Sequence, residues 1–165
     1  MPGEQRSNSR SAFNRRSELL DEINIRLLGE LREAPRMSMS ELARRVGMSA
    51  PAVTERIQRL ERVGVIAGYQ LQIDPASLGL PVSAFVRIRP APGQLPKVAA
   101  LAEELENVSE CHRITGEDCF LVRIHAGAVD ELEELLDRFL MFGQTTTSIV
   151  VSTPVPPRPL PLTPT

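Results

Sequence analysis

The chain has 165 residues, a length of about one or two small domains, and its composition is 42% hydrophobic and 24% charged. These values exclude a wholly disordered chain, a collagen and a polytopic membrane protein. No run of about 18 apolar residues predicts a membrane-spanning helix, and the polar start of the chain predicts no secretory signal. The two cysteines, Cys111 and Cys119, cannot build a disulfide framework, so we expect a reducing cytoplasm.

The net charge of -2 hides an uneven distribution along the chain. Residues 1–70 carry 12 arginines against 9 acidic residues, whereas residues 71–165 carry 7 basic and 12 acidic residues. A DNA-binding module joined to a second, acidic domain produces this asymmetry, although many proteins without a DNA role share it. Lys97 is the only lysine, and arginine suits contacts to phosphates and base edges.

A polar segment rich in Ser, Asn and Arg, residues 1–18, is predicted to be a flexible arm. From Leu20 onward apolar residues follow helical spacing, and Pro35 ends this first helix. A second, short helix is predicted from the S-x-x-E capping box that begins at Ser38. Gly47, which tolerates a left-handed backbone, is a natural end for it.

A third helix is predicted from Ser49, its N-cap, with Pro51 in the first turn and Gly64 at its end. Together, the second and third helices and the glycine turn between them have the spacing of a helix-turn-helix. The alternating residues that follow, 65–73, predict either a short β wing or a strand leading to a hinge at residues 74–75.

The second half of the chain predicts the order β-α-β-β-α-β, which matches the ferredoxin-like split βαβ motif. We expect strands over residues 82–89, 108–115, 120–125 and 146–152, and helices over residues 95–105 and 129–140. A hairpin turn at Gly116 joins the two middle strands. The segment from Pro154 is too rich in proline for a helix or a sheet, so it is expected to be extended.

The predicted fold class is therefore α+β, with an N-terminal winged helix-turn-helix and a C-terminal ferredoxin-like βαββαβ domain. The expected parts are a flexible arm over residues 1–18, a DNA-binding domain over 19–70, a linker over 71–80, an effector-binding and oligomerisation domain over 81–153, and a Pro-rich tail over 154–165.

The third helix is the sharpest functional candidate. If its apolar stripe faces the core, its polar face is free to enter the major groove of DNA, and the two arginines near its end suit phosphates. The candidate DNA-binding residues are Ser49, Ala50, Pro51, Thr54, Glu55, Gln58, Arg59 and Arg62. The alternative is an amphipathic helix with a solvated face, which the capped partner helix and the glycine turn argue against.

Neither a metal site nor a cofactor is expected. The potential metal ligands are Cys111, His112, Cys119 and His125. In the predicted hairpin residue 111 pairs near 122 and residue 114 near 119, which places the two cysteines on opposite faces of the sheet. Common catalytic motifs, including the P-loop, G-x-S-x-G and H-E-x-x-H, do not occur. An acylphosphatase-like enzyme would require Arg113 and Arg123 to converge on a phosphate-sized pocket.

The hairpin turn carries the candidate effector-binding residues, Thr115, Gly116, Glu117 and Asp118. A glycine beside a strand end allows close approach of a ligand, and the two acids could hold an ammonium group. A plain turn is the alternative that the residues alone leave open.

Taken together, these segments resemble the Lrp/AsnC family, the leucine-responsive or feast/famine transcriptional regulators. The matching strings are LDEINIRLL (20–28), SELARRVGMS (40–49), VTERIQRLERVGVI (53–66), IDPASLG (73–79), TGED (115–118) and TTTSIV (145–150). The resemblance spans about residues 20–152. The arm before the first helix is a departure from the family's usual start.

The resemblance implies a regulator that binds double-stranded DNA and responds to a small effector, an amino acid, held near the hairpin turn at residues 115–118. It also implies a homodimer that assembles into tetramers or octamers, without a membrane partner. A chromosome-organising DNA binder of low sequence specificity is the closest alternative, and it would show a steep salt dependence with little discrimination between sequences.

The sheet itself also predicts a dimer. In a ferredoxin-like domain the helices cover one face, and we expect Phe85, Leu121 and Ile149 to form an apolar patch on the other. Dimerisation would bury this patch and would present two recognition helices to a pseudo-palindromic site, with half-sites about 34 Å apart or a multiple of that distance.

Overall fold

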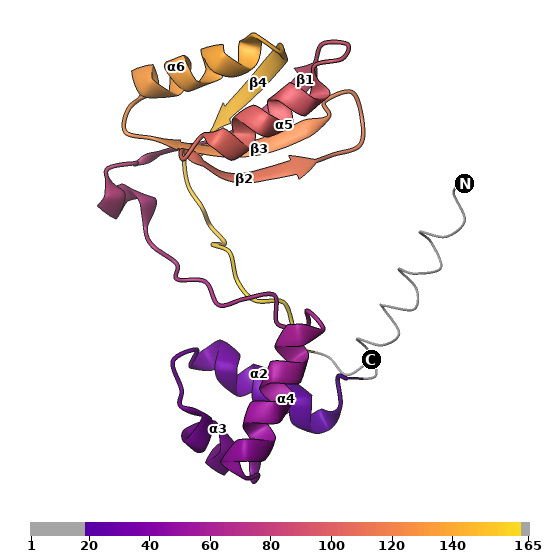
Figure 1. Cartoon of the computed structure of the whole chain (residues 1–165). Coiled ribbons are helices and arrows are strands. Elements are labelled where there is room, and N and C mark those ends of the chain that lie inside the picture. The colour runs from indigo at the N-terminus through magenta and orange to yellow at the C-terminus, as the bar shows by residue number, and fades with distance from the viewer. Residues whose placement is uncertain (1–18, 163–165) are drawn as a thin grey trace, which may run out of the picture. The chain divides into compact units, whose positions relative to one another are not determined.

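The computed structural model describes residues 19–162, and the arm predicted over residues 1–18 lies outside them. The chain forms two compact units (Figure 1). One contains the segment up to Leu71 together with the tail from Pro157, and the other spans Gln72–Pro156. Of the helices within residues 19–162, none has both the length and the apolar character needed to cross a membrane.

Within the described residues, the first unit contains three helices, α2 (Glu22–Glu33), α3 (Met39–Val46) and α4 (Ala50–Arg62). Their apolar stripes meet in a single core, whose completely buried side chains are Leu27, Leu42, Val53 and Leu60. This packing holds α3 and α4 in the helix-turn-helix arrangement that the sequence predicted.

The predicted starts of α3 and α4 are confirmed by their hydrogen bonds. The Ser38 hydroxyl accepts from the Glu41 amide at 3.2 Å, and the Ser49 hydroxyl accepts from the Ala52 amide at 3.4 Å. Each bond satisfies an amide that has no partner inside the helix. The predicted stop of α3 is also confirmed, since Gly47 caps it in the left-handed conformation with φ 73°.

The β wing, and the alternative strand to a hinge, do not form. Residues 67–74 have no regular structure. The side chains of Tyr69, Leu71 and Ile73 are at least half exposed. A strand is stable only when its backbone groups pair with a neighbour, and no segment within residues 19–162 pairs with this one. A short 3₁₀ helix, η1 (Pro75–Leu78), follows where a simple hinge was expected.

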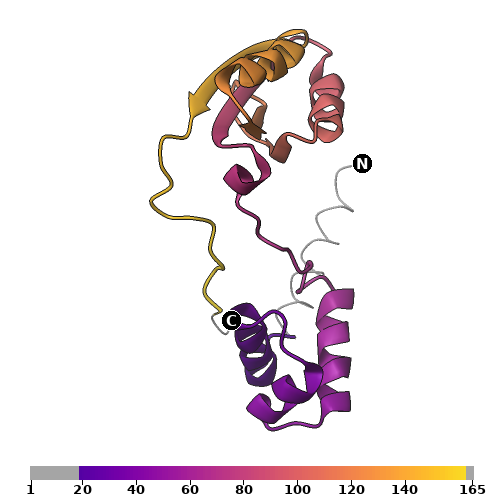
Figure 2. The ribbon, with the colours of Figure 1, turned by 90° about the vertical axis from the view of Figure 1, so that its left-hand side faces the viewer.

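The second unit has the predicted order of elements. Its elements are β1 (Val82–Pro90), α5 (Leu95–Glu104), β2 (Val108–Arg113), β3 (Phe120–Ala126), α6 (Val129–Leu140) and β4 (Gly143–Ile149). The strands form one antiparallel sheet in the order β2-β3-β1-β4. Both helices lie on the same face of this sheet (Figures 1 and 2).

The core of this unit lies between the sheet and the two helices. Alternate residues of the central strands point into it, and those with no exposed surface are Ala84, Val86, Ile88, Val122, Ile124 and Ala126. Phe139 of α6 is likewise completely buried. The strict alternation fixes the register of the sheet, because a shift of one residue would turn these side chains to the opposite face.

β4 begins and ends three residues earlier than the predicted 146–152. Its start is determined by pairing with β1, in which Gly143 lies opposite Pro90. A side chain at Gly143 would overlap the carbonyl oxygen of Arg89, so only glycine permits this close approach. The strand ends at Ile149, where it lies opposite Ala84.

The expected apolar patch on the helix-free face is wrong in part. Ile149 lies opposite the buried Ala84, and cross-strand partners share a face, so Ile149 belongs to the helix side. Phe85 and Leu121 do lie on the helix-free face. Their neighbours there are polar or charged, and they include Ser83, Arg87, Arg89, Glu110, His112, Arg123, His125, Gln144, Thr146 and Ser148.

Candidate DNA-binding and effector sites

The second helix of the helix-turn-helix, α4, exposes most of the residues predicted to bind DNA. Ser49 caps the helix and is exposed, and Pro51, Glu55, Gln58, Arg59 and Arg62 are exposed along it. Ala50 and Thr54 are half-buried. The Thr54 hydroxyl donates to the Ala50 carbonyl at 2.9 Å, which leaves its methyl group and its remaining acceptor capacity for a base.

Two arginines of this helix carry charge that the described chain does not neutralise. Within residues 19–162, Arg59 and Arg62 make no ion pair, and both are exposed in the last turn. Arg56, one turn earlier, is different. It bonds Asp21 Oδ2 at 2.7 Å and Asn24 Oδ1 at 3.0 Å, so it joins α4 to the start of α2. Arg56 is thus a positioning residue that sequence inspection missed.

The pKa of Asp21 reflects this junction. Burial disfavours its charged form, but the Arg56 guanidinium and the Asn24 amide outweigh burial, so the pKa lies below the ordinary 3.8. The carboxylate therefore stays ionised at neutral pH and holds Arg56. No local pattern signals the pair, because its members are 35 residues apart.

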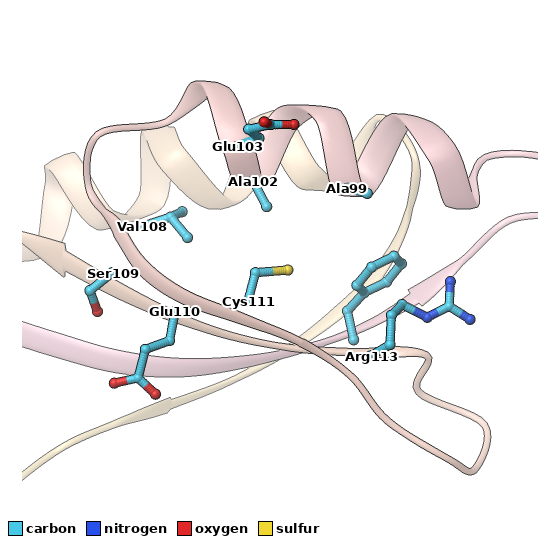
Figure 3. Close-up of a pocket in the computed structure, with 9 residues that line it drawn as sticks. Ala99, Ala102, Glu103, Val108, Ser109, Glu110, Cys111 and Arg113 are labelled. Carbon is cyan, nitrogen blue, oxygen red and sulfur yellow. The ribbon is translucent and has the colours of Figure 1, made fainter. Parts of the chain in front are cut away.

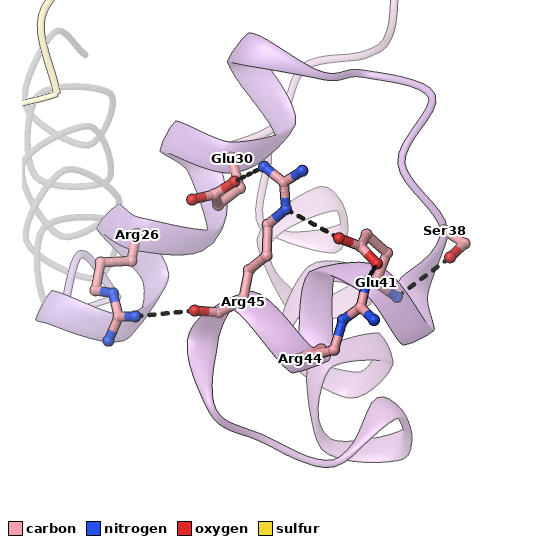
Figure 4. A network of polar contacts seen from close by, with 6 residues as sticks. All are labelled: Arg26, Glu30, Ser38, Glu41, Arg44 and Arg45. Carbon is pink, nitrogen blue, oxygen red and sulfur yellow. Dashed lines mark hydrogen bonds and ion pairs between the residues drawn. The ribbon is translucent and has the colours of Figure 1, made fainter.

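The arginines of α3 are occupied inside the unit (Figure 4). Arg45 bonds Glu30 at 2.7 Å and Glu41 at 3.2 Å, and Arg44 also pairs with Glu41. Arg26 of α2 donates to the Arg45 carbonyl at 3.1 Å. These contacts hold α2 and α3 together, and they leave the arginines at the end of α4 as the better candidates for phosphate binding.

In the second unit, the acids of the hairpin turn are paired with arginines of β1. Glu117 pairs with Arg89, and Asp118 lies 3.7 Å from Arg87 and 3.8 Å from Arg89. The turn therefore presents two carboxylates and two guanidinium groups side by side. Thr115 and Gly116 are exposed beside them, with Gly116 at φ 107°. The sequence suggested the acids but gave no sign of the arginines opposite them.

A cavity of about 420 Å³ lies between α5 and β2 (Figure 3). The Cys111 side chain lies on the side of β2 that faces the helix, whereas Glu110 points away from it. Burial raises the pKa of the Cys111 thiol, and the nearby Arg113 opposes this effect only in part. The cavity does not include the hairpin turn, and its lining residues are Ala99, Ala102, Glu103, Val108, Ser109, Glu110, Cys111, Arg113 and Phe120.

A polar cluster surrounds the buried His125 on the helix-free face. His125 Nε2 lies 3.1 Å from the Ser109 hydroxyl, and Arg123 bonds Glu110 at 3.1 Å. Burial lowers the pKa of His125 and Arg123 lowers it further, against the pull of Glu110. The Arg123 hydrogen bond dominates at Glu110 and lowers its pKa.

Three buried polar atoms of this face lack a hydrogen-bond partner within residues 19–162. They are Ser83 Oγ, Arg123 Nε and His125 Nδ1. Ser83 and His125 lie directly opposite each other on β1 and β3. An unpaired buried polar atom is costly, so these three atoms need partners that residues 19–162 do not supply.

Arg113 and Arg123, the arginines of the acylphosphatase-like alternative, lie on opposite faces of the sheet. Arg113 stacks over Phe120, 4.6 Å from its centroid, on the helix side of the sheet, whereas Arg123 lies 5.6 Å from the Phe85 centroid on the other side. The two arginines therefore do not converge as the acylphosphatase-like alternative requires. Among the described residues, no three His, Cys, Asp or Glu side chains gather as metal ligands would.

The chain matches two family models in sequence. Residues 20–61 match the AsnC-type helix-turn-helix domain, and residues 83–160 match the Lrp/AsnC ligand binding domain. The transcriptional regulator LrpC of Bacillus subtilis is 34% identical over 133 residues, which cover 81% of this chain and 92% of LrpC. LrpA of Mycobacterium tuberculosis is 36% identical over 140 residues, covering 83% and 93%.

Solved structures show the same relationship. The structure of B. subtilis LrpC superposes with a TM-score of 0.76 at 33% identity, covering 81% of this chain and 95% of LrpC. The feast or famine regulatory protein of M. tuberculosis, complexed with L-methionine, has a TM-score of 0.79 at 35% identity and covers 86% and 98%. Because both sequence and structure match over nearly the full length of these relatives, the chain belongs to the Lrp/AsnC family of transcriptional regulators.

Proposed function

We propose that the protein is a sequence-specific regulator whose assembly and DNA binding respond to a small effector, an amino acid. The observation that carries the DNA-binding part is the exposed face of α4, on which Gln58 stands beside two arginines that no residue of the described chain neutralises. Residues 19–70 form the DNA-binding domain, 71–80 the linker and 81–153 the effector and assembly domain. As a regulator of DNA, the protein acts in the cytoplasm.

On α4, the N-terminal residues read bases and the C-terminal arginines bind phosphates. Ser49, Ala50 and Pro51 begin the helix and would enter the major groove first. Thr54, Glu55 and Gln58 follow on the exposed face. Arg59 and Arg62 lie at the far end, where charge supports affinity for every sequence.

Dimerisation through the helix-free face of the sheet supplies the second recognition helix. This interface is supported by the unpartnered polar atoms of Ser83, Arg123 and His125, which a second copy would satisfy, rather than by an apolar patch. A two-fold dimer would bind a pseudo-palindromic operator of double-stranded DNA with half-sites about 34 Å apart, or a multiple of it. Dimers then join into tetramers or octamers.

The effector binds at the hairpin turn, near Thr115, Gly116, Glu117 and Asp118. An amino acid carries an ammonium group and a carboxylate. The acids of the turn suit the ammonium group, and the neighbouring arginines of β1 suit the carboxylate. Asp118 would receive the ammonium while Arg87 or Arg89 would receive the carboxylate, so the ligand replaces loose ion pairs of 3.7 and 3.8 Å. The M. tuberculosis relative solved with L-methionine supports this ligand class.

DNA binding is tested by selecting a site from a random pool and comparing its affinity with that of scrambled DNA. Gln58→Ala should reduce discrimination, whereas Arg62→Ala should weaken both DNAs alike and lower the salt slope by about 1. Equal losses on both DNAs from both variants would show that α4 does not read sequence. A wild-type protein with a steep salt slope and no discrimination would be a chromosome-organising binder instead.

Effector binding is tested by the light-scattering mass with each of the twenty amino acids. One amino acid should change the mass of the wild type, and Asp118→Asn should abolish the change without loss of DNA binding. Glu133→Gln, an exposed acid of α6, is the matched control and should respond normally. A response that survives in Asp118→Asn would move the effector to another site, of which the α5–β2 cavity is the first to examine.

A further inference from the structure

Part of the Pro-rich tail, residues 157–162, lies against the DNA-binding unit. Although the tail leaves β4 in the second unit, these residues belong to the compact unit of α2, α3 and α4. Arg32 Nη1 donates to the Leu160 carbonyl at 3.5 Å. One turn earlier on α2, Leu162 Cδ1 lies 4.0 Å from the position of a Cβ on Gly29, an ordinary contact distance.

An apolar groove lies beside this segment. Its volume is about 660 Å³, and it lies between α2 and the irregular residues that follow α4, with Pro159 of the tail in its wall. The other lining residues are Leu28, Leu31, Arg32, Pro35, Arg36, Ile66, Gly68, Tyr69, Gln70 and Leu71. Neither DNA contacts nor effector binding, as proposed above, make use of this groove.

The tail residues differ sharply in how much of their surface the unit covers. Leu162 is 36% exposed, whereas Leu160 is 83% and Val151 is 99% exposed. Leu162 is therefore the apolar anchor, Pro159 forms part of the groove wall, and Leu160 contributes its backbone carbonyl. Prolines hold such a segment extended before it docks, so little conformational entropy is lost on docking.

We propose that residues 157–162 are a strap that docks against α2 of its own chain, with Pro159 at the wall of this groove. The tail starts at the end of β4, so its docked residues contact the DNA-binding unit by non-covalent interactions, besides the covalent linker at 71–80. The strap stabilises α2. This inference does not depend on which DNA or effector the protein binds.

The protein contains a built-in reporter for this contact. Tyr69 lines the groove and is the only tyrosine, and the chain has no tryptophan. Its fluorescence therefore reports on the groove alone, and the tail adds no signal of its own. Removing residues 154–165 should increase quenching of Tyr69 by acrylamide and lower the midpoint of thermal unfolding of the first unit by about 4–8 °C.

Point variants separate docking from a general effect of the tail. Leu162→Ser should reproduce the deletion, whereas Leu160→Ser, the same change two residues away, should behave as the wild type. A synthetic peptide of residues 154–165, added to the shortened chain, should restore the Tyr69 signal in a saturable way. The same peptide with serine at its Leu162 position should not.

Three results would overturn the strap. Equal effects of Leu162→Ser and Leu160→Ser would show that Leu162 does not anchor the tail. Unchanged acrylamide quenching of Tyr69 in the shortened chain would show that the tail does not shield the groove. If the protection of Tyr69 from acrylamide falls on dilution together with the light-scattering mass, the tail beside the groove belongs to a second copy. The wild-type signal should be independent of protein concentration.

Discussion

Leu60→Ala should unfold the DNA-binding unit and leave the second unit folded. Leu60 has no exposed surface, and it packs in a core formed only by residues of the first unit. Replacing a buried leucine by alanine costs about 2–5 kcal/mol, because apolar contacts are lost and a cavity remains. A unit of about 50 residues is stable by only about 2.5–7.5 kcal/mol, so the variant removes most or all of that margin.

Hydrogen exchange followed by mass spectrometry measures the two units separately. In Leu60→Ala the amides of α2, α3 and α4 should lose protection while those of β1 and β3 keep it, and DNA binding should fall. Val122→Ala, in the other core, should give the reverse pattern of exchange. Gln58→Ala controls for a change on the exposed face of the same helix. Simultaneous loss of protection in both units of Leu60→Ala would refute the independence of the two cores.

Three further predictions concern charge. Burial lowers the pKa of His125, so below pH 6.5 the unfolded chain binds a proton that the folded chain does not, and the second unit should lose stability. In urea unfolding at pH 5–8, His125→Gln should flatten this dependence of stability on pH. Burial and the bond to Glu61 raise the pKa of Tyr69 to about 12, so its ultraviolet titration should move to lower pH in Glu61→Gln. Asp21→Asn keeps the oxygen that caps α2 but weakens the ion pair with Arg56, so the free energy of unfolding in urea should fall by less than about 1 kcal/mol. Asp21→Ala also removes the cap, so it should lower the free energy of unfolding by about 1 kcal/mol more.

Features that depend on neighbours in the sequence were predictable. Ser38, Gly47 and Ser49 act within one helical turn, so their residue types are enough to place the ends of α3 and α4. The order of strands and helices in the second unit follows from the change between alternating and helical spacing of apolar residues. From these elements the fold class and the exposed face of α4 could both be predicted.

Features that depend on partners distant in sequence were not predictable. The face on which Ile149 lies is decided by its pairing with Ala84, and the alternating segment 67–74 stays irregular because nothing in the described chain pairs with it. Arg56 meets Asp21 only because α4 crosses the start of α2.

The hairpin turn and the tail show the same division. The acids of the turn were visible in the sequence, but Arg87 and Arg89 come beside them only because β1 lies next to β3 in the sheet. The prolines of the tail excluded a helix or a strand, yet they could not indicate that Leu162 packs on α2. By itself the sequence determined the ends of α3 and α4 and the order of strands and helices along the chain, because these follow from local backbone preferences and apolar periodicity. The tertiary structure decided the charge partners, the faces and the docked tail, because those energies arise between residues that only folding brings together.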